Sequence, residues 1–247
     1  MKLGLYCQIG QSLDMAKFAI HHAIQNSGLT FRKDFDIVFI CWKTSPQVFE
    51  WLDANQYRLV DIGYEEGKGF LWNLYRGWNA GYKYWFNRYS EIDYVVPIAT
   101  DHYFHTNWLI NMLRWAKHNR IVNCKLIEPG TLPSLHTTRN FGLTTWKDFQ
   151  LNECINFCDK ISKNKLVVNE ANYGHRLDAM PFLVPRDVWR RFGPMNKTLD
   201  AAGITGDTNF FNRCKDGGVE ITKSLDAISY HCGGIETKRN AKQGVYT

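Results

Sequence analysis

Short apolar segments alternate with amphipathic ones through the first 120 residues, and this alternation most limits how the chain can fold. The apolar segments have the length and composition of buried parallel strands, and apolar side chains recur at helical spacing between them. The expected strands cover residues 3–8, 35–42, 57–61 and 92–101, and the expected helices begin near residues 12, 46, 71 and 108. Such alternation predicts a mostly parallel central sheet with helices on both faces, an α/β fold of the Rossmann-like type.

The second half of the chain is less regular. Residues 120–180 mix polar and aromatic side chains and predict a loop-rich insert, with one short helix near 149–158. After the insert we expect a strand at 180–184, a helix ending before Gly193, a helix over 207–215 and a last strand at 227–231. We therefore expect a single domain over residues 1–247, divided into 1–120, a variable insert at 121–180, and 181–247.

Charge, apolar runs and cysteine number limit which partners and which cellular compartment we expect. The formal charge of +6 favours anionic partners such as phosphates, nucleotides, acidic glycans or nucleic acid. No apolar run approaches the roughly 18 residues of a membrane-spanning helix, and the opening residues lack the pattern of a signal peptide. The seven cysteines are odd in number and form no Cys-x-x-Cys pair, so we expect reduced thiols. We expect no transmembrane segment and a cytoplasmic location.

Four polar or aromatic side chains fall at the carboxyl ends of the expected strands: Gln8, Trp42, Asp61 and Asp101. Ligands bind at these ends in parallel α/β sheets. Asp101, in the sequence Thr100-Asp101-His102, offers oxygen ligands to a divalent cation that also grips a diphosphate. The alternative is that Asp101 only caps the loop that follows.

Two further positions carry chemistry near the end of the chain. Asp207 lies where a helix is expected to begin, and exposed amides there keep a carboxylate ionised, as a general base must be. A plain helix cap is the alternative for Asp207. His231 ends a strand before Gly233 and Gly234, where it would bind metal or phosphate, although most single histidines are structural. A zinc site at His102 and His105 lacks the spacing of known zinc motifs.

Other enzyme classes lack their signatures. No Gly-x-Gly-x-x-Gly follows the first strand, and there is neither a Gly-x-x-x-x-Gly-Lys-Ser/Thr loop nor a Gly-x-Ser-x-Gly turn. The sequence therefore gives no support to a dinucleotide-dependent dehydrogenase, a P-loop NTPase or an α/β-hydrolase.

Taken in order, five segments resemble the inverting glycosyltransferases of family 2 and their rhamnosyltransferase-like relatives, which have the GT-A fold. The segments are Gly67-x-Gly69 with Asn79-Ala80-Gly81, residues 95–101 followed by Trp108-Leu109, residues 182–193, residues 206–213, and residues 227–234. The resemblance covers nearly the whole chain except the insert.

The resemblance implies a function for each half of the chain. Residues 1–120 would bind a nucleotide-diphosphate sugar, and residues 181–247 would bind the acceptor and supply the catalytic base. Mn²⁺ or Mg²⁺ would join the diphosphate to the metal ligands Asp101 and His231. Asp207 would accept the proton of an acceptor hydroxyl on a glycan or another molecule, and the sugar would be transferred with inversion. The donor-binding residues would be Gln8, Trp42, Asp61, Gly67, Gly69, Asn79 and Thr100.

The sequence also departs from the family pattern. Gly206-Asp207 replaces an acidic pair, and Trp42 with its neighbours replaces an Asp that contacts the nucleotide base in the family. Only one carboxylate, Asp101, remains where the family has Asp-x-Asp. Two alternatives follow from these departures and from the basic, aromatic composition: a module that binds nucleotide sugars or glycans without turnover, and a transferase that acts on nucleic-acid bases. Trp78, Trp108 and Trp146 are sugar-stacking candidates, with core packing favoured for the first two.

Overall fold

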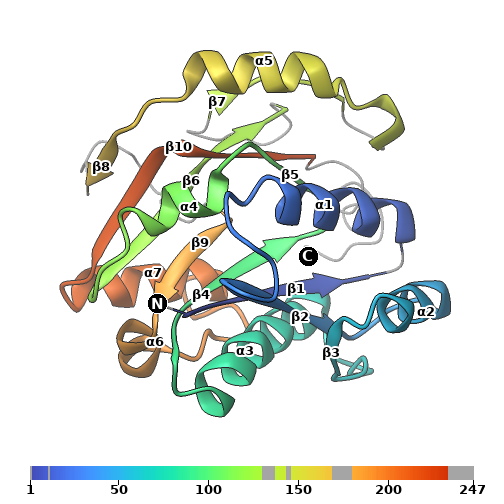
Figure 1. The fold of residues 1–247 in the computed structure, drawn as a ribbon. Coiled ribbons are helices and arrows are strands. Elements are labelled where there is room, and N and C mark those ends of the chain that lie inside the picture. Colours follow the sequence, from blue (N-terminus) through green and yellow to red (C-terminus); the bar gives the residue numbers. More distant parts are fainter. Residues whose placement is uncertain (1, 11, 130–136, 143–145, 169–179, 233–247) are drawn as a thin grey trace.

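The computed structural model describes residues 2–10, 12–129, 137–142, 146–168 and 180–232 (Figure 1). Its strands are β1 (Lys2–Ile9), β2 (Phe35–Cys41), β3 (Arg58–Asp61), β4 (Ile92–Ala99), β5 (His102–Phe104), β6 (Arg120–Glu128), β7 (Thr137–Thr138), β8 (Leu166–Val168), β9 (Phe182–Pro185) and β10 (Glu220–His231). Its helices are α1 (Leu13–Gln25), α2 (Pro46–Ala54), α3 (Phe70–Arg88), α4 (Trp108–Leu113), the 3₁₀ turn η1 (Trp146–Asp148), α5 (Leu151–Ile161), α6 (Arg186–Phe192) and α7 (Gly206–Asp216).

The strands form one sheet in the order β3-β2-β1-β4-β9-β6-β10-β5, with β7 beside β6 and β8 beside β10. The four strands from β3 to β4 are parallel to one another, as the alternation of strands and helices predicts. β6 and β10 are also parallel, whereas β9 is antiparallel to both of its neighbours. The prediction of a mostly parallel sheet is confirmed.

Helices cover both faces of the sheet, which Figure 1 shows edge-on. Successive side chains of a strand point to opposite faces, so β1 sends Leu3, Leu5 and Cys7 into a core that α1, α2 and α4 share. Tyr6 points the other way, into a second core with α3, α6 and α7. α5 lies over a third cluster that contains Tyr103 and Tyr230. Trp78 and Trp108 are buried in these cores, which agrees with the packing role favoured for them.

α3 lies very close to β1, and glycines make this approach possible. A Cβ atom on Gly4 would lie 2.5 Å from the Trp85 ring, and one on Gly81 would overlap the Tyr6 ring. The indole nitrogen of Trp85 donates a hydrogen bond to the carbonyl of Leu5 at 2.7 Å. These contacts fix the second half of α3 against the middle of β1.

Replacing Gly81 with alanine should lower the free energy of unfolding. Alanine gains about 1 kcal/mol of helix propensity over glycine. Its methyl group, however, must displace a buried tyrosine ring, and such overpacking costs about 1–3 kcal/mol. We expect a net loss, measured by urea unfolding. Gly69→Ala is the control, because nothing lies within 4 Å of that Cβ position; an equal loss in both variants would contradict the packing argument.

The structure corrects one expectation about the sheet. Residues 120–128 do not begin a loop-rich insert: they form the nine-residue strand β6 in the sheet interior, and its polar residues Asn123 and Lys125 hid it from a reading based on apolar runs. The side-chain nitrogen of Asn123 donates a hydrogen bond there to the carbonyl of Thr222. β4 runs through Pro97, which pairs with β1. Its other neighbour, β9, pairs only with Tyr94 and Val95, so Pro97 is paired on one side alone. Where the insert begins and ends stays a prediction.

No helix among the described residues is long and apolar enough to span a bilayer. All seven cysteines are buried free thiols.

Candidate functional site

The predicted strand-end residues lie along one edge of the sheet because their strands are parallel. Gln8 is the penultimate residue of β1, Asp61 ends β3, and Trp42 directly follows β2. Asp101 follows β4 in the turn that leads into β5. His231 ends β10, whose partner β6 ends at Glu128, and the pairing of Tyr230 with Ile127 brings these two ends together.

Three side chains converge at the end of β10. Asp101, His102 and His231 each offer a ligand atom, and these atoms lie within 4.8 Å of one another. His231 and His102 are paired residues of β10 and β5, and their rings stack 4.7 Å apart. Nε2 of His231 lies 3.2 Å from one carboxylate oxygen of Asp101, and Nε2 of His102 lies 3.7 Å from the other. The predicted metal pair is thus brought together, and His102 joins it.

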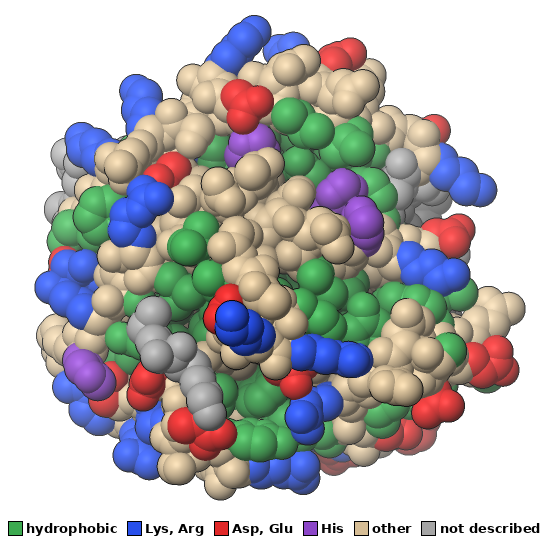
Figure 2. Space-filling view, viewed as in Figure 1, with side chains coloured by type: hydrophobic (Ala, Val, Ile, Leu, Met, Phe, Trp, Pro, Cys, Tyr) green, Lys and Arg blue, Asp and Glu red, His purple; other side chains and the backbone are tan. Residues whose placement is uncertain are grey.

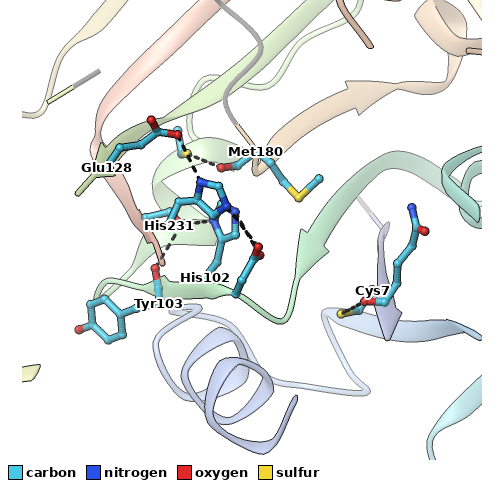
Figure 3. Close-up of polar contacts among 10 residues, drawn as sticks. Cys7, His102, Tyr103, Glu128, Met180 and His231 are labelled. Atoms are coloured by element: carbon cyan, nitrogen blue, oxygen red, sulfur yellow. Dashed lines mark hydrogen bonds and ion pairs between the residues drawn. The ribbon is translucent and has the colours of Figure 1, made fainter. Parts of the chain in front are cut away.

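The other ring nitrogen of each histidine is held by a second residue. Nδ1 of His231 lies 3.2 Å from Oε1 of Glu128, as Figure 3 shows, and Nδ1 of His102 lies 2.8 Å from the hydroxyl of Ser229. Metal-binding histidines in proteins are oriented in this way by carboxylate and hydroxyl partners. Both Nε2 atoms are therefore directed at Asp101.

Mutual electrostatics set the charges of the three groups. Burial alone would lower the pKa of His231, but Asp101 and then Glu128 raise it to about 10. Burial alone would raise the pKa of Asp101, but His231 holds it well below its usual value. Burial, reinforced by the charge of His231, lowers the pKa of His102 to about 3. At neutral pH the cluster is therefore a carboxylate, a neutral imidazole and an imidazolium, and His231 becomes a metal ligand only by giving up its proton.

The donor set fits a divalent cation. Oδ1 of Asp101 is buried and accepts no hydrogen bond from any residue that the structure describes. A buried carboxylate oxygen without a donor is costly unless a cation or water satisfies it. One carboxylate and two imidazoles form a mixed oxygen and nitrogen set that suits divalent first-row transition ions, Mn²⁺ among them, and the set leaves further coordination positions for other oxygen ligands.

A hydrogen-bond network connects the ends of β1 and β2 to α3. The side-chain nitrogen of Gln8 donates to the carbonyl of Leu74 at 3.0 Å, and its oxygen accepts from the indole nitrogen of Trp42 at 2.7 Å. Trp42 stacks on Tyr64 with ring centroids 5.9 Å apart. Gln8 therefore holds Trp42 in place, and Trp42 with Tyr64 forms an aromatic pair beside the ends of β2 and β3.

The predicted base, Asp207, is hydrogen-bonded to the residue of α3 that follows Leu74. Asp207 is in the first turn of α7, as expected, and its Oδ1 accepts a hydrogen bond from the hydroxyl of Tyr75 at 2.7 Å. The adjacent residue of α3, Leu74, is the one bound by Gln8. Asp207 is thus tied to the same end of α3 as the predicted donor-binding residues.

The remaining predicted residues have different surroundings. Asp61 is exposed and its Oδ1 accepts the amide proton of Gly63. Gly67 adopts a left-handed φ of 75° and Gly69 precedes α3, so both belong to the loop before that helix. Asn79, by contrast, is buried, and its amide exchanges two hydrogen bonds of 2.9 Å with the backbone of Met195. Its contacts give no support to a donor-binding role, and we leave it out of the site proposed below.

The remaining residues considered from the sequence either have no part in the metal cluster or lie outside the described residues. Thr100 precedes Asp101 in the turn after β4. His105 joins no metal group among the described residues and instead binds Asp159 at 3.0 Å. Gly233, Gly234 and the side chain of Trp146 lie outside the described part of the chain.

Sequence reasoning missed Glu128 and gave His102 too little weight. Glu128 went unnoticed because its strand was not recognised. His102 is adjacent to Asp101 in sequence, but only the antiparallel pairing of β5 with β10 places its ring beside His231. Had β6 been predicted, the position of Glu128 at the carboxyl end of a strand would have indicated a site residue.

The excess positive charge is spread out. On the face that Figure 2 shows, basic side chains surround the outline and are interspersed with acidic ones. Elsewhere in the described residues, basic side chains pair with acidic ones, such as Arg58 with Asp36 at 2.6 Å and Arg120 with Glu220 at 2.8 Å. This face presents no continuous basic stripe of the kind that nucleic-acid binding uses.

Comparisons with known proteins agree with this architecture. No family model matches the chain, and no curated protein sequence matches it. Among solved structures, the chain is similar to S. aureus TarS, with a TM-score of 0.63 and 11% identity over 94% of this chain and 36% of that one. A structure of TarS 1-349 in complex with UDP gives a TM-score of 0.60 and 13% identity, over 93% of this chain and 60% of that one.

A structure of GalNAc-T7 with UDP, GalNAc and Mn²⁺ is also similar, with a TM-score of 0.59 and 11% identity over 94% of this chain and 44% of that one. This chain therefore spans between about a third and three fifths of the proteins that it matches. It has the GT-A-like glycosyltransferase fold, with a mostly parallel central sheet. The narrower resemblance to rhamnosyltransferase-like enzymes stays a prediction.

Proposed function

We propose that the chain transfers a sugar from a nucleotide-diphosphate sugar to an acceptor hydroxyl, with inversion, assisted by Mn²⁺ or Mg²⁺. The observation that carries the proposal is the convergence of Asp101, His102 and His231 at the carboxyl edge of a GT-A-like sheet. The structures of TarS with UDP and of GalNAc-T7 with UDP and Mn²⁺ support the choice of donor class and metal.

The three ligands would hold the metal, and Glu128 and Ser229 would orient the two imidazoles toward it. A divalent cation at this position neutralises the charge that develops on a departing diphosphate. Trp42, stacked on Tyr64 and held by Gln8, offers an aromatic face to the nucleotide base in place of the family's carboxylate. Asp61, Gly67, Gly69 and Thr100 would complete the donor site along the same edge.

Asp207 would act as the base. Its carboxylate is partly exposed, at the start of α7, where the helix amides stabilise the charged form. The acceptor oxygen gives its proton to Asp207 as it bonds to the anomeric carbon. The bond from that carbon to the diphosphate oxygen breaks with its electron pair, so a single displacement inverts the centre.

Release of nucleotide diphosphate tests the proposal. The purified chain would be incubated with UDP-, GDP- and TDP-sugars in Mn²⁺, with and without a simple sugar acceptor, and again after chelation by EDTA. Release from one donor that is lost on chelation and restored by Mn²⁺ supports the proposal. Donor binding by calorimetry without any release would instead support the non-catalytic binding module.

Glu128→Gln should weaken Mn²⁺ binding about 10–100-fold, the usual effect of removing an outer partner of a metal-bound histidine. Gln keeps the size of the side chain but loses the charge that holds His231. The dissociation constant would be measured by electron paramagnetic resonance of free Mn²⁺. Glu220→Gln is the matched control, because Glu220 pairs with Arg120 and Lys117. Equal Mn²⁺ affinity in Glu128→Gln and the control would contradict the role of Glu128.

A further inference from the structure

The two carboxylate oxygens of Asp207 have different surroundings. Oδ1 accepts two hydrogen bonds, from the hydroxyl of Tyr75 at 2.7 Å and from the amide of Thr208 at 2.9 Å. No residue in the described part of the chain donates to Oδ2. An oxygen that already accepts two donors is a poor site for a further proton, so Oδ2 is the oxygen left to receive one.

Gly206 allows Tyr75 to reach this position. A Cβ atom at residue 206 would overlap the carbonyl oxygen of Asn196 and lie 3.1 Å from the Tyr75 ring. The first turn of α7 therefore rests directly on the tyrosine. In the family that the sequence resembles, an acidic residue stands at this position. Here the space that such a side chain would need is occupied by the ring of Tyr75 and the backbone of Asn196.

Tyr75 is itself rigidly held. Its side chain is 3% exposed and packs edge-on against Trp78, with ring centroids 5.8 Å apart. Burial, followed by the charge of Asp207, raises the pKa of Tyr75 far above its ordinary value, so the hydroxyl keeps its proton and is the donor to Asp207. The neighbouring carbonyl of Leu74 is bound by Gln8, which ties this part of α3 to the end of β1.

We infer that Tyr75 is a positioning residue: it binds Oδ1 of Asp207 and so leaves Oδ2 to take the acceptor's proton. The inference rests on the proposed transferase function. Tyr75 does not touch the reacting atoms. It fixes the rotation of the carboxylate, and a base held in one orientation transfers a proton more efficiently than one that rotates freely.

Tyr75→Phe tests this inference because it removes only the hydroxyl. The loss of a hydrogen bond to the charged carboxylate of Asp207 should lower kcat about tenfold or more. The donor KM should change less than about twofold, because Tyr75 does not contact the donor. Tyr82→Phe is the matched control, since Tyr82 is equally buried in α3 but packs on Tyr6 and Trp189. The control should keep the kcat of the wild type.

The same substitution in an Asp207→Asn background separates positioning from a merely structural role. If Tyr75 acts through Asp207, the double variant should turn over no more slowly than Asp207→Asn alone. A full additional loss in the double variant, or an unchanged kcat in Tyr75→Phe, would overturn the inference. Thermal unfolding of each variant shows whether the fold is kept, and a Tyr75→Phe protein that loses kcat only by unfolding would also overturn it. Full turnover by Asp207→Asn would refute the proposed base itself, a different result from either of these.

Discussion

Asp207→Asn should slow sugar transfer by two to four orders of magnitude, about 10²–10⁴-fold, while leaving donor binding unchanged. Asn retains an oxygen for the hydrogen bonds from Tyr75 and Thr208, but an amide replaces the oxygen that would take the proton. Removing a general base lowers rates about 10²–10⁴-fold, so kcat for nucleotide diphosphate release in the presence of acceptor should fall by that factor. The dissociation constant of the donor, measured by calorimetry with Mn²⁺, should stay the same.

The matched control for this variant is Asp216→Asn. Asp216 is an exposed residue at the other end of α7, so its change in charge equals that of Asp207→Asn without touching the site. Asp216→Asn should keep full activity. If the two variants behave alike, Asp207 is not the base; the cap role considered for it from the sequence is already excluded, because Thr205 is the N-cap of α7.

Asp101→Asn should remove Mn²⁺ binding and turnover together. The carboxylate contributes the only formal negative charge among the three ligand atoms and faces both imidazoles. Loss of a direct ligand should exceed the roughly 10–100-fold effect of an outer partner, so we expect Mn²⁺ affinity to fall more than about 100-fold. Free Mn²⁺ is measured by electron paramagnetic resonance, and turnover by nucleotide diphosphate release.

Asp159→Asn provides the control for Asp101→Asn. Asp159 also lies against a histidine, His105, at 3.0 Å, but outside the metal cluster. Its substitution should leave Mn²⁺ affinity and turnover at wild-type values. Undiminished Mn²⁺ binding by Asp101→Asn would show that the metal binds elsewhere, and the proposed assignment of ligands would be wrong.

Much of the fold was predictable because its signals are local. The apolar runs that became β1, β2 and β4 are buried on both faces, and helices such as α6 and α7 are bounded by Pro185, Gly193 and Gly217. Alternation of these elements was enough to predict a parallel sheet covered on both faces. β6 was missed because polar residues such as Asn123 interrupt its apolar pattern. The strand that pairs with β6 and accepts the hydrogen bond of Asn123 is β10, about 100 residues later, and no local pattern reveals such a partner.

The site was predictable only in part, for the same reason. Asp101 and His231 were expected together through a family resemblance, and the structure brings them within 3.2 Å. His102 and Glu128 depend on which strands lie beside β10, a fact of tertiary pairing. The aromatic pair of Trp42 and Tyr64, and the tyrosine bound to Asp207, likewise join segments that are far apart in the sequence.

The alignment of β10 with its two neighbouring strands places three side chains of the site: His231, Glu128 and His102. β10 carries His231, sets Glu128 opposite through its pairing with β6, and sets His102 opposite through its pairing with β5. If β10 slipped by one residue, His231 would turn to the other face of the sheet and all three partners would be lost at once. Binding of a cation therefore selects one alignment of this strand over its neighbours, and Mn²⁺ should protect the backbone amides of β5, β6 and β10 from hydrogen exchange as a single cooperative unit.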